Sequence, residues 1–279
     1  MFSIAVIVIA SCIGLAPAPP AAPKVALIFD DIGNNYEHGR AAIELPHPFA
    51  YAMLPFSPHA KSLAHMANSL DKDVLVHLPM EAEHDNHLLG PGALRVDMSQ
   101  HEIESTVLKS IAAIPHAIGI NNHMGSRLTR ESAHMRWLMH AIHRRGGLFF
   151  VDSRTTTDSV ALEWAERSQI AASFRDVFLD NVQSRRYIED QLNTLVKTAK
   201  INGHALGIAH PHPLTIDVFQ KWNASETGIQ IVKLSEYIQL HQTIVGPPSR
   251  PLQTRHFSAT KCGNDSDDSY SAENPYTKW

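Results

Sequence analysis

Val25-Ala-Leu-Ile-Phe-Asp-Asp-Ile-Gly33 sets the architecture of the chain, because five apolar residues run directly into two adjacent aspartates and a glycine. The apolar run predicts a buried strand that ends at Gly33. Two carboxylates cannot both ionise cheaply beside a core unless a cation compensates them. Later strand-like runs also end in polar residues: His77, His123, Asp152, Asp180 and His210. The pattern indicates a site at the carboxyl edge of a parallel sheet, and imidazole with carboxylate indicates a metal ion.

Strand and helix patterns alternate from Lys24 onward. Strands are expected at residues 25–31, 49–55, 74–79, 117–123, 148–153, 177–181 and 205–210, with a weaker one at 229–234. Ser99 and Glu102 predict a capping box at the start of a helix, and Thr129 is expected to cap the next helix. The alternation predicts an α/β fold, namely a distorted or incomplete (β/α) barrel of about seven parallel strands. No glycine-rich phosphate loop is present, so no nucleotide is expected.

The bulk composition limits the partners and the location. The 279 residues are 44% hydrophobic, enough for one large domain, and the net charge of -4 without a basic stripe argues against nucleic acid. Residues 1–18 read as a signal peptide or as a lipoprotein signal with Cys12 as the lipidated residue. The alternative is a short N-terminal anchor helix, or an apolar tail without an address. We therefore expect export to the periplasm or envelope of a bacterium, with membrane anchoring only through the N-terminus.

The chain is expected to hold one folded domain. Residues 19–23 form a Pro/Ala linker, residues 24–246 the barrel, and the polar residues 247–279 a disordered tail.

Two stretches in the middle of the chain could carry chemistry. His77 ends a predicted strand, and Glu81 lies four residues further on, which suits a divalent ion or a proton relay; the alternative is a histidine bonded to backbone. The stretch from Gly119 to Arg127 is dense in polar residues. Asn122, His123, Ser126 and Arg127 can offer a ligand, donors and an anion contact, or a turn that satisfies its own backbone.

Two later stretches add further candidates. Asp152 and Arg154 can pair with each other or orient a catalytic base. Prolines flank His210 and His212 and restrict their loop, so these histidines can serve as a general acid or a ligand; the alternative is a rigid loop with solvated histidines.

These stretches together resemble the divergent polysaccharide deacetylase family, a branch of the polysaccharide deacetylase superfamily. The resemblance covers Lys24 to about Tyr237. Its motifs are Phe29-Asp-Asp-Ile-Gly33, Leu54-Pro-Phe-Ser57, His77-Leu-Pro-Met-Glu81, Asn122-His-Met-Gly-Ser126, Val151-Asp-Ser-Arg154 and His210-Pro-His-Pro213. The resemblance implies a distorted (β/α) barrel, a divalent metal that is usually zinc, and hydrolysis of N- or O-acetyl groups on sugars.

The resemblance also implies roles for single residues. Asp30 is the candidate base, His210 the candidate acid, and Asp152 resembles the acid that orients partners. Asp31 and His77 are candidate metal ligands. Glu81 stands where ordinary members of the superfamily have a second metal histidine, so His123 is the candidate replacement ligand. The candidates for substrate binding are Glu81, Asn122, Ser126, Arg127, Arg154 and His212.

Three functions remain open from the sequence. The leading hypothesis is a metal-dependent hydrolase that deacetylates an envelope or extracellular polysaccharide, acting on amide or acetyl ester bonds of sugars. The alternative is a catalytically inactive glycan-binding or cell-wall-associated barrel, because the second histidine is missing. A weaker option is hydrolysis of another bond such as a phosphodiester, with Arg127 and Arg154 serving the anion. A serine nucleophile is disfavoured because no G-x-S-x-G elbow occurs.

Overall fold

The computed structural model describes residues 21–242. The predicted signal at residues 1–18 with Cys12, residues 19–20 of the predicted linker, residues 243–246 of the predicted barrel, and the predicted tail at 247–279 lie outside the described residues. Within the described part, no helix is both long and apolar enough to cross a membrane. The domain boundaries stay predictions.

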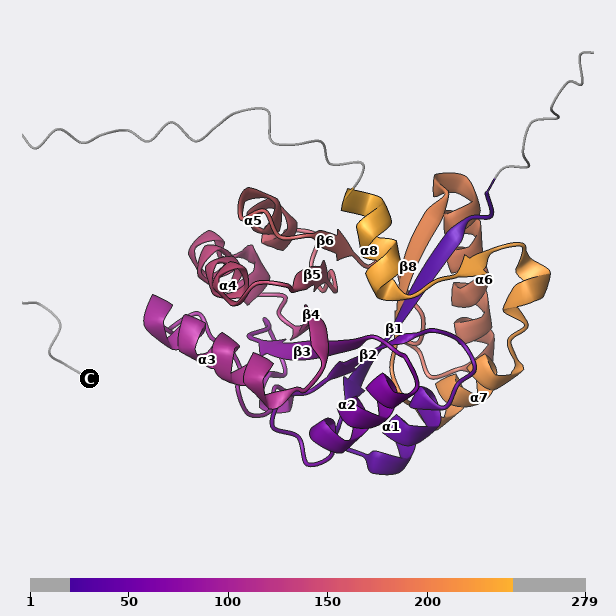
Figure 1. Ribbon diagram of the computed structural model, residues 1–279, viewed down its shortest axis with the longest axis horizontal. Helices are drawn as coiled ribbons and strands as arrows, with labels where there is room; N and C mark the ends of the chain where they lie inside the picture. Colours follow the sequence, from indigo (N-terminus) through magenta and orange to yellow (C-terminus); the bar gives the residue numbers. More distant parts are fainter. Residues whose placement is uncertain (1–20, 243–279) are drawn as a thin grey trace, which may run out of the picture. The chain divides into compact units, whose positions relative to one another are not determined.

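A curled sheet of parallel strands forms the centre of the fold (Figure 1). Its order is β6-β5-β4-β3-β2-β1-β8-β7, and β9 pairs with the start of β1. The strands are β1 (Lys24–Ile32), β2 (Ala50–Met53), β3 (Val74–Met80), β4 (Ala117–Met124), β5 (Phe149–Asp152), β6 (Ala172–Phe174), β7 (Val177–Phe178), β8 (His204–Ala209) and β9 (Gln230–Ile231). Every predicted strand is present, and the incomplete (β/α) barrel is confirmed. The short strand β6 was not predicted.

Helices surround the outside of the sheet, and the last helix lies between β6 and β8 in the view of Figure 1. The helices are α1 (Tyr36–Ile43), α2 (Ala60–Ser69), α3 (Gln100–Ala113), α4 (Ser132–Arg145), α5 (Ala161–Arg167), α6 (Arg185–Asn202), α7 (Pro213–Lys221) and α8 (Leu234–Gln242).

Two predicted helix starts have different outcomes. The capping box of α3 is confirmed, because Ser99 accepts a hydrogen bond from the Glu102 amide and Glu102 accepts one from the Ser99 amide. The predicted cap at Thr129 is wrong. Thr129 lies in a 3-10 turn, and its hydroxyl donates to the carbonyl of Gly125 at 2.8 Å. Helix α4 begins at Ser132, three residues later, because the turn comes between.

The two faces of the sheet form separate apolar clusters. Side chains alternate along a strand, so one face of β1 carries Val25, Leu27 and Phe29, which pack with the surrounding helices. The other face carries Ala26 and Ile28, which pack inside the barrel. Helix α8 closes this inner cluster, because its Leu234, Tyr237 and Ile238 are buried there. The inner cluster fills the barrel below the carboxyl ends of the strands and gives the site a rigid floor.

The barrel does not close by strand pairing. Within the described residues, β6 and β7 are the two ends of the sheet and do not pair with each other. Arg175 and Asp176 cross this seam instead. The Arg175 amide donates to the Asp152 carbonyl at 3.0 Å, and the Asp176 amide donates to the Leu206 carbonyl at 2.9 Å. The Arg175 guanidinium also donates to the carbonyls of Ser153 and Arg154 at 2.7 Å each.

Candidate metal centre

A bulge in β1 brings both aspartates to one place. Ile28 pairs with Ala50, Phe29 with Tyr51, and Ile32 with Met53, so Asp30 and Asp31 together face Ala52. Asp31 has a φ of 57°, in the left-handed region that aspartate tolerates better than most residues. Regular alternation would send Asp31 to the opposite face from Asp30. The bulge redirects it, which is a known use of bulges beside active sites.

Alternation places the other candidates on the inner face. Asp30 follows Ala26 and Ile28 on this face of β1, and His77 follows Leu75 on β3. On β4, Asn121 and His123 alternate with the outer-cluster residue Ile120. His210 follows Leu206 and Ile208 directly after β8. The residues therefore meet at the carboxyl edge because each continues the inner row of its own strand.

Asp31, His77 and His123 form a triad of potential metal ligands. Asp31 Oδ1 lies 2.9 Å from His123 Nδ1 and 3.2 Å from His77 Nε2, and the two nitrogens are 3.2 Å apart. Ligand atoms at about 2.0–2.1 Å from a tetrahedral zinc ion are roughly 3.3 Å from each other. The triad is thus close to the spacing that an ion requires.

The hydrogen bonding of Asp31 agrees with this arrangement. Asp31 Oδ1 is buried and has no well-formed hydrogen bond among residues 21–242, although two imidazole nitrogens lie within 3.2 Å of it. A buried carboxylate oxygen without a donor is costly. A cation between the three atoms would satisfy it, so the donor set and its geometry fit a divalent metal.

The charges in the site are strongly coupled. Burial acts to raise the pKa of Asp31, but His123 and His77 outweigh it and hold this pKa well below its usual value. Burial acts to lower the pKa of His77, but Asp30 and Asp31 outweigh it and raise this pKa. Burial raises the pKa of Asp30, while His77 and His210 counteract the rise. The two carboxylates therefore differ: Asp31 is an acidic ligand, whereas Asp30 holds a proton more readily.

Asp30 is held by the side-chain amide of Asn121. Asn121 Nδ2 donates to Asp30 Oδ1 at 2.7 Å, and Asn121 Oδ1 lies 2.8 Å from His77 Nδ1. Asp30 Oδ2 is 3.7 Å from His77 Nε2, the nitrogen that faces the triad. One oxygen of Asp30 is thus fixed in the interior, and the other faces the candidate metal position.

His210 is held by a second buried carboxylate, Asp180. Asp180 Oδ1 lies 3.0 Å from His210 Nδ1, while Oδ2 accepts hydrogen bonds from the His210 amide at 2.8 Å and the Thr215 hydroxyl at 2.9 Å. Burial acts to lower the pKa of His210, but Asp180 and Asp31 outweigh it and raise this pKa to about 9. His210 Nε2 points toward the triad, 3.9 Å from Asp31 Oδ2.

The predicted partners Glu81, Ser126 and Arg127 lie together at the end of β3. Glu81 accepts a hydrogen bond from the Val96 amide at 2.8 Å and pairs with Arg127 at 3.1 Å. Ser126 accepts one from the Glu83 amide. Glu81 is thus occupied by partners other than the triad, and a direct role for these residues with substrate stays a prediction.

Within the described chain, the remaining candidates on β4 and around the end of β5 are bonded to backbone or to an aromatic ring and not to the triad. Asn122 shares the outer face with Ile120; it accepts from the Ser153 amide and donates to the Met124 carbonyl. Asp152 accepts a hydrogen bond from the Arg154 amide at 2.8 Å, and the Arg154 guanidinium lies over the Phe174 ring at 3.9 Å. The expected pairing of Asp152 with Arg154 is therefore through the backbone.

His212 is exposed beside His210, with ring centroids 5.9 Å apart. Its nitrogens also lie near Asp180, as a second group of potential ligands. However, both oxygens of Asp180 already have the donors described above.

Two residues of the site were missed as participants. The sequence marks Asp180 as a polar strand end without a role, and it places Asn121 only within the polar stretch from Gly119 to Arg127. Asn121 is fully buried on the inner face, in register with His77 on β3. A polar residue in an inner row of apolar side chains was the signal that could have found it.

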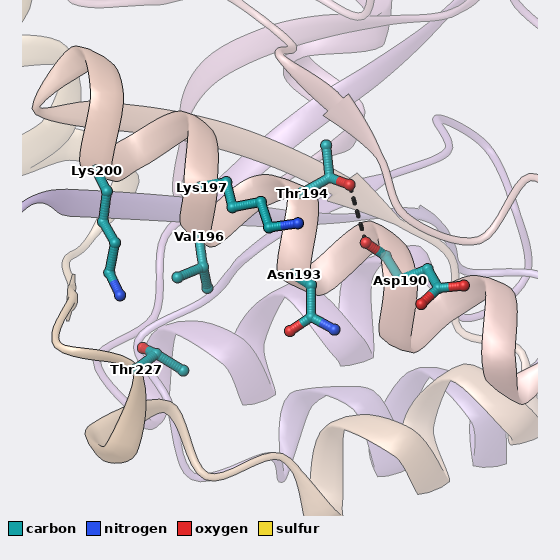
Figure 2. A pocket seen from close by; sticks show the side chains of 7 residues that line it. All are labelled: Asp190, Asn193, Thr194, Val196, Lys197, Lys200 and Thr227. Atoms are coloured by element: carbon teal, nitrogen blue, oxygen red, sulfur yellow. Dashed lines mark hydrogen bonds between the residues drawn. The ribbon is translucent and has the colours of Figure 1, made fainter.

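Figure 2 shows a surface groove that is separate from this site. It runs along α6 and is lined by residues such as Asp190, Asn193, Lys197 and Thr227. Thr194 donates a hydrogen bond to the Asp190 carbonyl at 2.9 Å, within the helix itself. None of its lining residues is a site candidate, so the groove adds nothing to the triad.

Known proteins share both the sequence and the fold of this chain. The uncharacterized protein YibQ of Escherichia coli (strain K12) is 34% identical over 234 residues, which cover 84% of this chain and 73% of YibQ. An uncharacterized protein of Haemophilus influenzae (strain ATCC 51907 / DSM 11121 / KW20 / Rd) is 32% identical over 200 residues, covering 72% and 71% of the two chains.

A crystal structure of an uncharacterized protein from Agrobacterium tumefaciens C58 has the same fold. Its TM-score is 0.74 at 24% identity, with 79% of this chain and 91% of that chain covered. Residues 27–238 match the family described as divergent polysaccharide deacetylase. The match spans every strand that contributes to the site, and the chain belongs to the divergent polysaccharide deacetylase family.

Proposed function

We propose that this protein is a metal-dependent deacetylase of an envelope or extracellular polysaccharide. The observation that carries the proposal is the convergence of Asp31 Oδ1 with one nitrogen from each of two histidines, all within 3.2 Å of one another, although Asp31 Oδ1 has no well-formed hydrogen bond within the described chain. The family to which the chain belongs supports an acetylated sugar as the substrate. The bond broken is an amide or an acetyl ester, and the products are acetate and a free amine or hydroxyl.

Asp31, His77 and His123 would hold a divalent ion, for which zinc suits the imidazole and carboxylate donors. When bound, such an ion supplies Lewis-acid polarisation of the acetyl carbonyl and lowers the pKa of water. The protein would add the orientation of the ligands. His77 is fully buried and bonded at Nδ1 to Asn121, so only its Nε2 faces the triad.

Asp30 would act as the general base. Its Oδ2 is directed toward the triad while Oδ1 is held by Asn121. As water attacks the acetyl carbon, a carbon–oxygen bond forms and the proton of that water passes to Asp30. The raised pKa of Asp30 favours this transfer, because a base is most effective when its pKa approaches the working pH.

His210 would act as the general acid. A pKa of about 9 keeps its ring protonated at neutral pH, and its Nε2 faces the triad. It would deliver a proton to the nitrogen or oxygen of the sugar as the bond to the acetyl carbon breaks. After the reaction, Asp30 has gained one proton and His210 has lost one. Transfer of one proton from Asp30 to solvent and of one from solvent to His210 restores both groups for the next turnover.

The proposal is tested with purified protein, first for metal content and then for acetate release from chitin oligomers, peptidoglycan fragments and acetylated polymers. Asp31→Asn should lose the metal. Asp30→Asn should keep the metal and lose turnover by about 100-fold or more. Asp71→Asn is the matched control, because Asp71 has the same φ of 57° but lies on the surface away from the triad; it should keep both properties.

Undiminished acetate release after complete removal of metal would refute the mechanism. A protein that binds glycans equally well with Asp30→Ala, and releases acetate from none of the substrates, would instead be the inactive glycan-binding barrel. For the location, we propose export to the bacterial envelope, where such glycans occur. Detection of the native protein only in the cytoplasmic fraction would contradict that location.

A further inference from the structure

A single side-chain amide connects the triad to the candidate base. Asn121 is completely buried at the centre of the site. Its Oδ1 lies 2.8 Å from His77 Nδ1, and its Nδ2 lies 2.7 Å from Asp30 Oδ1 and 3.4 Å from the Ser153 hydroxyl. Asp30 comes from β1, His77 from β3, and Ser153 directly follows β5, whereas Asn121 lies on β4 between β3 and β5.

The direction of each hydrogen bond follows from the chemistry of the partners. An ionised carboxylate can only accept, so the Asn121 amide nitrogen must face Asp30. The Asn121 oxygen must then face His77, and an oxygen can only accept. His77 Nδ1 therefore carries the hydrogen, which leaves the lone pair on Nε2, the nitrogen 3.2 Å from Asp31 Oδ1.

We propose that Asn121 is a positioning residue that sets the His77 tautomer for metal binding and the orientation of Asp30 as base through the two ends of one amide. This inference rests on the proposed deacetylase function for Asp30 but not for His77, whose tautomer can be observed without turnover. Because the amide is planar, the two hydrogen bonds cannot be adjusted independently, and a movement of His77 is transmitted to Asp30.

Two variants of Asn121 separate the two ends of the amide. Asn121→Asp keeps an acceptor for His77 Nδ1 but replaces the amide donor to Asp30 with a second carboxyl, which repels the Asp30 carboxylate. Asn121→Leu is similar in size and removes both. Tyr51→Phe is the control for general destabilisation, since it deletes another buried hydrogen bond, 2.7 Å from the Tyr51 hydroxyl to the Ala42 carbonyl on the helix side of β2.

The first measurement uses metal-free protein at an alkaline pH at which the His77 ring is neutral, because Asp30 and Asp31, against the effect of burial, raise the pKa of His77. Nitrogen-15 NMR of the imidazoles should show His77 in the Nδ1–H form in the wild type, in Asn121→Asp and in Tyr51→Phe. In Asn121→Leu it should show a mixture of both tautomers. Zinc titration against a chromophoric chelator should give a dissociation constant about 10–100-fold weaker for Asn121→Leu and nearly unchanged for the other two.

The second measurement is acetate release by the zinc-loaded enzyme. Asn121→Asp should reduce kcat at least about 10-fold with KM within about twofold of the wild type, since it disturbs Asp30 rather than substrate binding. Folding of each variant is checked by circular dichroism, and Asn121→Asp keeps the test decisive where Asn121→Leu does not fold. Wild-type tautomer and zinc affinity in folded Asn121→Leu, or full kcat in Asn121→Asp, would overturn the proposal.

Failure of the proposed function gives a different result. In that case the wild type itself would release no acetate, while the tautomer and the zinc affinity would still respond to Asn121→Leu. A wild-type His77 in the Nε2–H form would contradict the role of Asn121 whatever the activity.

Discussion

Replacing His123 with alanine tests which side chain completes the triad. The sequence offered two candidates, Glu81 by its spacing from His77 and His123 through the family resemblance. In the structure His123 Nδ1 is 2.9 Å from Asp31 Oδ1, whereas Glu81 pairs with Arg127. His123→Ala should therefore weaken metal binding, and Glu81→Gln should not.

The expected magnitude follows from the number of ligands. Structural zinc sites with four protein ligands bind with about 10–16 kcal/mol, so one ligand contributes about 3 kcal/mol, or roughly a 100-fold change in Kd. At a zinc concentration of about 100 times the wild-type Kd, zinc stabilises the wild type by about 2.7 kcal/mol but a 100-fold weaker variant by only about 0.4 kcal/mol. Loss of the Glu81 charge should cost at most about 1 kcal/mol, because Arg127 is half exposed.

The assay is chemical unfolding with and without zinc, together with direct zinc titration. His123→Ala should lose nearly all of the zinc-dependent stabilisation, while Glu81→Gln should keep it on a slightly lower baseline. Equal stabilisation of His123→Ala and the wild type would refute the assignment of His123. Loss of the zinc-dependent stabilisation in Glu81→Gln would show that Glu81 is a metal ligand.

Three further changes have expected outcomes. Asp180→Asn should bring the pKa of His210 down from about 9 toward 6.5 in an NMR titration of metal-free protein. Because the folded pKa lies above the unfolded one, the wild type should lose stability between pH 6.5 and about 9, and the variant less of it. An unchanged His210 titration would exclude Asp180 as the cause. Gly119→Ala should lower the free energy of unfolding by about 1–3 kcal/mol, since its Cβ would lie 2.3 Å from the packed Phe149 ring; a variant as stable as the wild type in urea would show that the ring can move aside. Zinc affinity should fall from pH 7 to pH 5, because protonated histidine cannot bind metal, and a pH-independent Kd would speak against imidazole ligands.

Most of the architecture was predictable because the strands are read from local patterns. The apolar run before Asp30 and the polar ends of later strands indicated a parallel sheet and the edge that carries the site. The strand β6 was missed because Ala172–Phe174 has only three residues, too few for a periodic signal. The seam between β6 and β7 was also not predicted, because it depends on hydrogen bonds from Arg175 and Asp176 to carbonyls of residues far away in the sequence.

The site was less predictable because its geometry depends on pairing between strands. The bulge opposite Ala52 is a property of the β1–β2 register, and it alone turns the Asp31 side chain to the same face of the sheet as Asp30. The contact of Asn121 with Asp30 spans 91 positions, and no local pattern reports it. Glu81 shows the opposite error, since a suitable local spacing to His77 was overridden by Arg127, which lies close in space but far along the chain.

Helix α8 has a consequence for how the chain can be divided. Leu234, Tyr237 and Ile238 fill the barrel from below, and the Ser235 amide donates to Asp73 in the segment before β3 at 2.7 Å. The first half of α8 is therefore part of the barrel core. A chain shortened to residue 233 would expose the inner apolar cluster to water. His77 and His123 would then lose the rigid packing on which the spacing of the triad depends.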